Sequence, residues 1–355
     1  MMRRMTKEDS KFISVFEPTI TFKDKVSVLR SLNKKDISGS SSTIKKFEET
    51  IFHQFDRKYA VSVSNGSVAL DLALNVFNFD KNDEIIVPSF TIISCLSAII
   101  RSGGKPVFCD VDINSWNMTL DNVKKVFNKN TKAILMVHTY GLTAEATEIK
   151  QFSNDNGLIL IEDTAEAHGQ TYNNIKCGSF GDVSTLSFYA NKHITTGEGG
   201  MVLTDDEEIY ESLIQMRNLD FKPKTRFQHD NLFWNYRLGG LQAALGISQS
   251  KNLKSIIEKK IRQGHIYDEF LSEVNQIILP LKKTNRSKNH YWVYGIVLKE
   301  KNRDELQNYL LSSGIQTRKF FWPLHLQNAL PWEFKTNETS SAAVVLGYHG
   351  LYLPI

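Results

Sequence analysis

The first two thirds of the chain alternate between short apolar runs and amphipathic segments. Apolar runs bounded by polar or glycine-containing stretches predict buried strands, and apolar residues spaced three or four positions apart predict helices. Residues 43–55, for example, place Phe47, Ile51 and Phe55 on one helical face. Strands are expected at residues 59–63, 84–87, 106–111, 133–137, 158–163, 186–189 and 201–204, with helices at residues 43–55, 68–77, 93–100 and 120–127.

This alternation predicts an α/β fold with a mostly parallel sheet covered by helices. After about residue 243 the pattern changes to a long lysine-rich helix, followed by a strand at residues 291–298 and a helix at residues 303–312. A chain of 355 residues is long enough for two such units. We therefore expect a large domain over residues 1–243 and a smaller C-terminal α+β domain over residues 244–355.

Candidate chemistry begins at Lys192, in the segment SFYANKHITTGEGG at residues 187–200. This lysine follows a strand-like run, precedes a glycine-rich turn and has few charged neighbours. A lysine in such a place can attack a carbonyl and form a Schiff base, which is how proteins hold pyridoxal 5′-phosphate (PLP). A lysine beside a glycine turn is more often structural, so the prediction depends on residues upstream.

Two upstream motifs supply what PLP also needs. Asp163 ends the apolar run at residues 158–163, and the carboxyl end of a buried parallel strand is where ligands bind in open α/β sheets. An aspartate there can keep a pyridine nitrogen protonated, or it can simply cap the next helix.

The phosphate candidate is the turn that contains Gly66 and Ser67, between a strand and the helix at residues 68–77. Free backbone N–H groups at a helix N-terminus favour an anion, and Ser187 could add a hydroxyl. The turn matches neither a Walker loop nor a dinucleotide fingerprint. A strand–glycine–helix junction is common, so the prediction of PLP depends on the turn, Asp163 and Lys192 occurring together.

The chain resembles the DegT/DnrJ/EryC1/StrS family of PLP-dependent sugar aminotransferases, with matches from Pro18 to Pro354. The motifs that carry the resemblance are residues 63–74, 83–91, 137–141, 161–169, 187–200, 235–238 and 318–325. The resemblance implies the aspartate aminotransferase fold, also called PLP fold type I. Members of the family usually continue beyond Ile355 through a further helix, so we expect the small domain to be shortened.

The resemblance also implies roles for individual residues in the large domain. Lys192 would form the Schiff base with the cofactor and later move the proton, and Asp163 would pair with the pyridine nitrogen. Glu166 would lie near the hydroxyl side of the ring. The residues expected to hold the phosphate are Gly66, Ser67 and Ser187.

Other implied roles involve the second subunit and the substrates. Asn235 would reach the phosphate from the other subunit of a homodimer with shared active sites. Arg237 would bind the carboxylate of the amino donor, and His325 would bind the nucleotide sugar. Ile92 stands where the family usually stacks an aromatic side chain on the ring, which predicts weaker stacking here.

The implied reaction moves an amino group from L-glutamate to a nucleotide-linked 4-keto-6-deoxyhexose. Residues 191–200, and His229-Asp230 ahead of Asn235, most resemble members that convert GDP-4-keto-6-deoxymannose to GDP-perosamine for surface polysaccharides such as lipopolysaccharide O-antigen.

Several alternatives stay open at this stage. One is amination of a UDP- or dTDP-linked ketosugar, or amination at C3. Another is sugar dehydration, although related dehydratases carry histidine at the lysine position and here His193 comes one residue later. A catalytically inactive PLP-binding homologue is the third.

Composition limits the remaining classes of function. Lys and Arg number 43 against 39 Asp and Glu, a balance that argues against a dedicated nucleic-acid binder. Three widely spaced cysteines, Cys95, Cys109 and Cys177, match neither a disulfide framework nor a zinc motif, so no metal is expected. The basic N-terminus has no apolar run after it, and the apolar stretch at residues 91–100 is too short to span a bilayer. We therefore expect a cytoplasmic protein that acts away from membranes.

Overall fold

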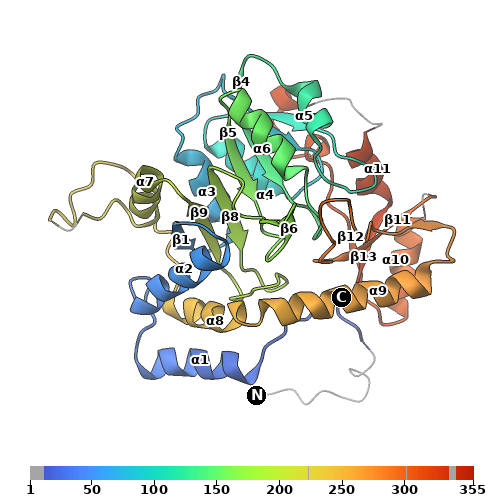
Figure 1. Cartoon of the computed structure of the whole chain (residues 1–355), viewed down its shortest axis with the longest axis horizontal. Helices are drawn as coiled ribbons and strands as arrows, with labels where there is room; N and C mark the ends of the chain where they lie inside the picture. The colour runs from blue at the N-terminus through green and yellow to red at the C-terminus, as the bar shows by residue number, and fades with distance from the viewer. Residues whose placement is uncertain (1–11, 223, 301, 336–340) are drawn as a thin grey trace.

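A seven-stranded sheet forms the centre of the molecule, with the strand order β1-β9-β8-β5-β4-β2-β3 (Figure 1). The computed structural model describes residues 12–222, 224–300, 302–335 and 341–355. Four neighbouring strand pairs are parallel and the two pairs that involve β9 are antiparallel. The predicted α/β class with a mostly parallel sheet is confirmed.

All seven strands predicted in this region are present, with ends shifted by at most a few residues. The strands are β1 (Tyr59–Val63), β2 (Glu84–Pro88), β3 (Lys105–Cys109), β4 (Thr131–Val137), β5 (Ile159–Asp163), β8 (Val183–Ser187) and β9 (Gly200–Thr204). The helices on this sheet are α2 (Ser42–Gln54), α3 (Gly66–Asn75), α4 (Ile93–Arg101), α5 (Leu120–Val126), α6 (Ala146–Asp155) and α7 (Glu207–Arg217). Every residue of β2, β8 and β9 is buried, because helices cover both faces of the sheet.

Strand direction decides where the motifs meet. Strand β9 is antiparallel to both β1 and β8, so β1 and β8 run in the same direction, and β8 is parallel to β5. The carboxyl ends of β1, β5 and β8 therefore lie at one edge of the sheet. That edge carries the turn at Gly66, the carboxylate of Asp163 and the segment that leads to Lys192.

A second, four-stranded antiparallel sheet lies beside the first. Its order is β10 (Ile277–Ile278), β11 (Tyr294–Leu298), β13 (Gly350–Leu353) and β12 (Arg318–Lys319). The same part of the chain also forms α10 (Arg303–Ser312), η2 (Leu324–Leu326), η3 (Trp332–Phe334) and α11 (Ala342–His349). A short hairpin of β6 (Thr171–Tyr172) and β7 (Ile175–Lys176) lies between β5 and β8 in the sequence.

The lysine-rich helix predicted after residue 243 is in fact two helices, α8 (Gly240–Ser250) and α9 (Leu253–Leu271). The side-chain amide of Asn252 donates to Ser248 O (3.5 Å), a local bond that competes with a continuous helix. Figure 1 shows α8 and α9 following one another from the main sheet to the second sheet, with α1 (Phe22–Asn33) packed against α8. The expected domain division at residue 243 falls within α8 and stays a prediction; residues 1–11 of the expected large domain lie outside the described residues.

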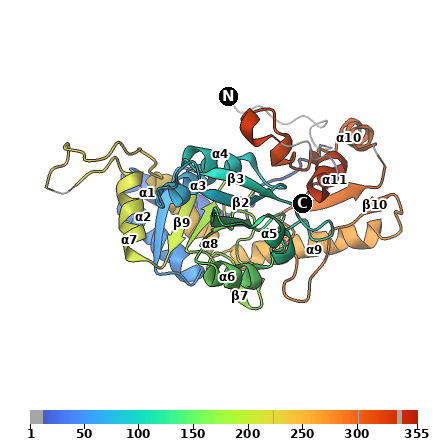
Figure 2. The same ribbon diagram turned by 90° about the horizontal axis from the view of Figure 1, so that it is seen from above.

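The described part of the segment between α7 and α8 extends away from the body of the molecule in both views (Figures 1 and 2). Within the described ranges, every helix is too short or too polar to cross a membrane.

The two sheets meet at Gly141, in the loop after β4. Gly141 has φ +93°, and a Cβ atom there would lie 2.6 Å from the backbone N of Trp292 and 2.9 Å from that of Tyr291. The side-chain amide of Gln170 donates to Gly141 O (2.7 Å) and to Lys288 O (2.6 Å). Only glycine fits this approach, which packs the segment before β11 against the main sheet.

A buried carboxylate, Glu162, joins β5 to the turn before β8. Its oxygens accept hydrogen bonds from Gly178 N, Phe180 N, Gly181 N and Ser184 Oγ at 2.6–3.1 Å. His138 Nε2 lies 3.0 Å from Glu162 Oε1, and His138 Nδ1 accepts from Ala144 N, so the imidazole proton belongs on Nε2. Burial alone raises the pKa of Glu162, but these hydrogen bonds outweigh burial and lower its pKa to about 2.

Replacing this carboxylate should change both stability and its dependence on pH. A folded-state pKa of about 2 lies below the ordinary value of 4.5, so Glu162 stabilises the fold above about pH 4.5, and this contribution is lost as the pH falls towards 2. We expect Glu162→Gln to lower the free energy of unfolding at pH 7 by about 3–5 kcal/mol. Its stability should also vary less between pH 5 and pH 2 than that of the wild type.

Urea unfolding across this pH range measures both effects. The exposed Glu258→Gln is the matched control and should follow the wild type. A Glu162→Gln protein that is as stable as the control at pH 7 would contradict the role assigned to Glu162.

Candidate active site

The carboxyl ends of β1, β5 and β8 open onto a cavity of about 500 Å³. Seven of the predicted site residues line it: Gly66, Ser67, Ile92, Asp163, Glu166, Ser187 and Lys192. The second sheet closes the cavity from the other side with side chains that include Arg318 and Tyr352.

Lys192 lies in the turn after β8 with its side chain only 10% exposed. Its Nζ is 3.4 Å from Glu166 Oε1 and 3.8 Å from the centre of the Trp292 ring. Burial raises the pKa of Glu166 to about 7, although the nearby Lys192 and the N–H of Tyr140 (2.9 Å) act in the opposite direction. Near neutral pH, Glu166 can therefore either hold or release a proton beside the lysine amine.

Asp163 presents a buried carboxylate at the end of β5. Its Oδ1 accepts from Ala165 N (3.0 Å) and Thr185 Oγ1 (3.3 Å), whereas Oδ2 is 3.5 Å from the thiol of Cys95. Burial raises the pKa of Asp163 above its ordinary value. Because a thiol is a weak donor, Oδ2 is suited to a further cationic N–H such as that of a pyridinium.

The turn between β1 and α3 provides a place for an anion. The Asn65 side chain caps α3 by accepting from Val68 N (3.0 Å), and the hydroxyls of Ser67 and Ser94 lie 2.7 Å apart. A Cβ atom on Gly66 would lie 2.7 Å from the Cβ of Ser187, so glycine lets the helix N-terminus approach β8 closely. Hydroxyls and backbone N–H groups at a helix N-terminus suit a phosphate.

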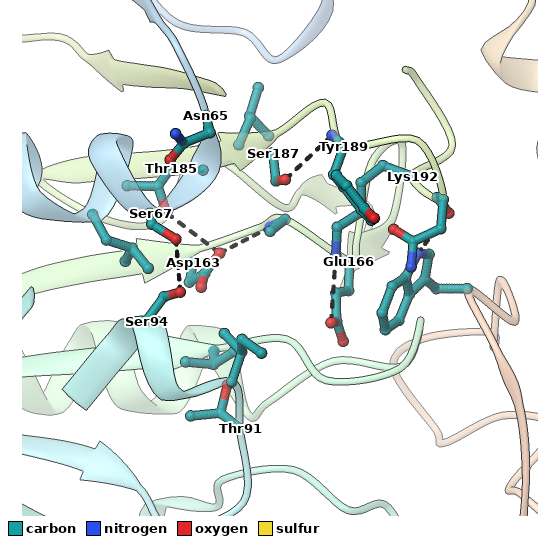
Figure 3. Close-up of a pocket in the computed structure, with 18 of the residues that line it drawn as sticks. Asn65, Ser67, Thr91, Ser94, Asp163, Glu166, Thr185, Ser187, Tyr189 and Lys192 are labelled. Atoms are coloured by element: carbon teal, nitrogen blue, oxygen red, sulfur yellow. Dashed lines mark hydrogen bonds and ion pairs between the residues drawn. The ribbon is translucent and has the colours of Figure 1, made fainter. Parts of the chain in front are cut away.

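Figure 3 shows how these groups are ordered across the cavity: Ser67 and Asp163 lie toward one side, Glu166 and Lys192 toward the other, and Ser187 between them. A phosphate, a ring nitrogen and an aldehyde carbon are the parts of PLP that such groups would hold. The residues present therefore fit this cofactor.

The model of one protein family matches residues 19–355, nearly the whole chain. This chain belongs to the DegT/DnrJ/EryC1/StrS aminotransferase family. It is 35% identical to the GDP-perosamine synthase of Escherichia coli O157:H7 over 97% of this chain and 93% of that protein.

Solved structures agree in fold. The Helicobacter pylori aminotransferase PseC, involved in the biosynthesis of pseudoaminic acid, superposes with a TM-score of 0.90 at 26% identity, covering 97% of this chain and 94% of PseC. The E. coli GDP-4-keto-6-deoxy-D-mannose-3-dehydratase with bound hydrated PLP gives 0.87 at 26% identity, covering 96% and 94%. The predicted family, its fold and its PLP-dependent sugar aminotransferase class are confirmed.

Three predicted site residues of this aminotransferase do not line the cavity of the single chain. Asn235 is exposed and forms a β-bridge with Asn218, and Arg237 donates to Asn218 Oδ1 (2.6 Å). His325 is buried in η2, with its ring centre 6.1 Å from that of Phe108. The roles predicted for Asn235, Arg237 and His325 stay predictions.

Ile92 lines the cavity as the N-cap residue of α4 and is 40% exposed. Its place against the cofactor ring stays a prediction. The nearby Phe90 cannot take over that role, because it is fully buried and packs on Tyr140, with ring centres 5.6 Å apart.

Sequence reasoning missed several residues of the site. Thr185 could have been found, because it precedes Ser187 by two positions on one strand and so shares its face. Arg318 and Tyr352 come from the second sheet and Trp292 from the segment just before β11, and no local pattern indicates which of these residues meet the first sheet. The side chains of His138, Glu162 and Cys177 lie close enough to hold a metal ion, but hydrogen bonds already use both nitrogens of His138 and both oxygens of Glu162.

The close approach at Gly66 generates a test of the phosphate site. Gly66→Ala adds a methyl group 2.7 Å from Ser187 Cβ and should push β8 and α3 apart. We expect the affinity of the apoprotein for PLP to fall by about tenfold or more, equivalent to at least ~1.4 kcal/mol. Absorbance titration measures the affinity, and thermal unfolding reports on folding.

Ser67→Ala is the comparison variant, because it removes one hydroxyl and leaves the backbone in place. It should weaken PLP binding less than Gly66→Ala does. Wild-type affinity in Gly66→Ala would show that the phosphate does not lie in this turn.

Proposed function

We propose that this enzyme transfers an amino group from L-glutamate to C4 of GDP-4-keto-6-deoxymannose and forms GDP-perosamine. The observation that carries the proposal is one cavity, in a chain 35% identical to a GDP-perosamine synthase, that combines Lys192, Asp163, Ser187 and the turn at Gly66. The product would serve surface polysaccharide synthesis. Buried, unpaired cysteines fit the reducing conditions of the cytoplasm.

PLP, when bound, would supply an electron sink that makes the Cα–H bond of the amino donor acidic and would carry the amino group from the donor to the ketosugar. Asp163 maintains that property by keeping a proton on the ring nitrogen, and the N-terminus of α3 with Ser187 holds the phosphate. Lys192 Nζ accepts the Cα proton of the donor and later releases it. Glu166, 3.4 Å from Lys192 Nζ, lies on the hydroxyl side of the ring in this proposal and can share a proton there.

The enzyme then works in two halves. L-glutamate gives up its amino group and leaves as 2-oxoglutarate before the ketosugar enters, so the kinetics should be ping-pong. In the second half, Lys192 returns a proton on the path to the aminosugar. In this proposal Arg237 binds the donor carboxylate and His325 the nucleotide sugar.

We further infer a homodimer in which Asn235 reaches the phosphate of the other subunit. The segment that leads to Asn235 extends from the body of the molecule and carries Phe227 and Leu232, which are 78% and 98% exposed. Large apolar side chains exposed to this degree favour burial against a partner.

Sugar dehydration is the second candidate, because a GDP-4-keto-6-deoxy-D-mannose-3-dehydratase shares the fold with a TM-score of 0.87. The presence of Lys192 favours transamination, since its amine can both bind the cofactor and shuttle a proton. His193, the residue after Lys192, is buried and does not line the cavity.

The substrate assignment is tested by incubating the PLP-loaded protein with L-glutamate and GDP-4-keto-6-deoxymannose. Mass spectrometry should find a product with an amine in place of the ketone, and NMR should place that amine at C4. Parallel reactions contain the corresponding UDP- and dTDP-linked ketosugars. Conversion of only these would leave the reaction class intact and contradict the GDP sugar, whereas loss of the C3 hydroxyl would indicate a dehydratase.

The role of Lys192 is tested separately. Lys192→Ala should reduce the turnover number by at least about 10⁴-fold, because both Schiff-base formation and proton transfer lose their amine. Borohydride reduction of the wild-type holoenzyme, followed by peptide mass spectrometry, should find the pyridoxyl group on Lys192. Near-normal turnover of Lys192→Ala would contradict the proposed mechanism.

A further inference from the structure

Trp292 contacts the amine on which the proposed mechanism depends. Lys192 Nζ lies 3.8 Å from the centre of the indole ring, within the distance at which an ammonium is attracted to an aromatic face. Nζ is also 3.4 Å from Glu166 Oε1. The free amine therefore contacts both a carboxylate and an aromatic face.

The indole is fixed in this place by its own contacts. Trp292 is 4% exposed, and its Nε1 donates to the carbonyl of Asn191, the residue before Lys192 (2.9 Å). Its backbone carbonyl accepts from Lys260 Nζ (3.1 Å). The hydrogen bond to Asn191 O ties the ring to the backbone that carries the lysine, so the ring and the amine keep their relative position.

The backbone before Trp292 is strained in a way that aims the ring. Tyr291 has φ +50° although it is not glycine, a conformation that costs of order 1–3 kcal/mol. Its N–H donates to Asn289 Oδ1 (2.7 Å), its hydroxyl donates to Asp268 Oδ2 (3.0 Å), and Gly141 leaves room for its backbone. Neighbouring packing therefore stabilises a strained turn whose next residue faces Lys192.

We propose that the face of Trp292 is the resting position of Lys192 Nζ whenever this amine is released from the cofactor, and that it holds the ammonium formed when the amine takes the donor's proton, so that Trp292 acts as a positioning residue for proton transfer. The inference rests on the proposed role of Lys192. A released lysine has four rotatable methylene bonds, and without a partner it would leave the reacting carbon. The indole face attracts the ammonium but cannot accept its proton, unlike Glu166, so it holds the charged amine without competing for that proton.

The test compares Trp292→Phe, which keeps an aromatic face, with Trp292→Leu, which does not. The donor half-reaction is followed in a single turnover with L-glutamate and with its α-deuterated form. We expect Trp292→Leu to be about tenfold slower with an increased deuterium isotope effect and a similar KM, and Trp292→Phe to stay within about threefold of the wild type. The exposed Trp332→Leu is the control and should behave as the wild type.

A second readout does not depend on turnover. In protein labelled with ¹³C-lysine and loaded with pyridoxamine 5′-phosphate, Lys192 is not attached to the cofactor. A ring face 3.8 Å away should shift the ε-CH₂ proton signal of Lys192 upfield in the wild type and in Trp292→Phe, but not in Trp292→Leu. The signal is assigned by its absence from Lys192→Ala.

Two results would overturn the inference alone: an unshifted Lys192 signal in the wild type, or equal isotope effects and rates in the Leu and Phe variants. Either can occur while borohydride still places the cofactor on Lys192, which would leave the proposed function standing. If borohydride places the cofactor on another lysine, both the proposed function and this inference fail. Thermal unfolding of each variant shows whether Trp292→Leu is misfolded or only has a mispositioned amine. Trp292→Phe is the reference for this comparison, because it keeps most of the buried volume.

Discussion

The direction of three strands determines where this molecule can do chemistry. β1, β5 and β8 must end at the same edge of the main sheet, since each carries a different part of the cofactor site at its carboxyl end. The antiparallel strand β9 makes this arrangement work, because it lies between β1 and β8 and leaves them pointing the same way. The turn at Gly66, the carboxylate of Asp163 and the amine of Lys192 then converge without any long loop to carry them.

The two acids at the end of β5 show how closely fold and site are connected. Glu162 and Asp163 are neighbours on one strand and therefore point to opposite faces of the sheet. Glu162 satisfies the backbone N–H groups of the turn before β8, whereas Asp163 faces the cavity. A shift of strand register by one residue would exchange the two carboxylates, and so the stability of the turn and the placement of the Asp163 carboxylate in the cavity depend on the same register.

The sequence was sufficient to predict the strands of the main sheet and seven residues of the cavity. Their signals are local: an apolar run, an acid where it ends, a glycine before a helix. Trp292, Arg318 and Tyr352 could not be found in this way, because their position depends on how a second sheet packs against the first. Asn235 and Arg237 show the converse, since their motif is clear in the sequence while the single chain leaves them outside the cavity.

The contact at Gly141 has a consequence for motion. The side-chain amide of Gln170 donates both to Gly141 O, in the loop after β4, and to Lys288 O, in the segment before β11. The backbone of Trp292 lies too close to Gly141 for a methyl group to fit between them. An outward rotation of the second sheet would break these hydrogen bonds and leave buried amide groups without partners. The main sheet and the second sheet should therefore move as one rigid body on the timescale of turnover. The amino donor and the ketosugar acceptor would enter the cavity in turn through an opening that does not close. Access to the cavity would be governed by side-chain rearrangement rather than by hinge closure.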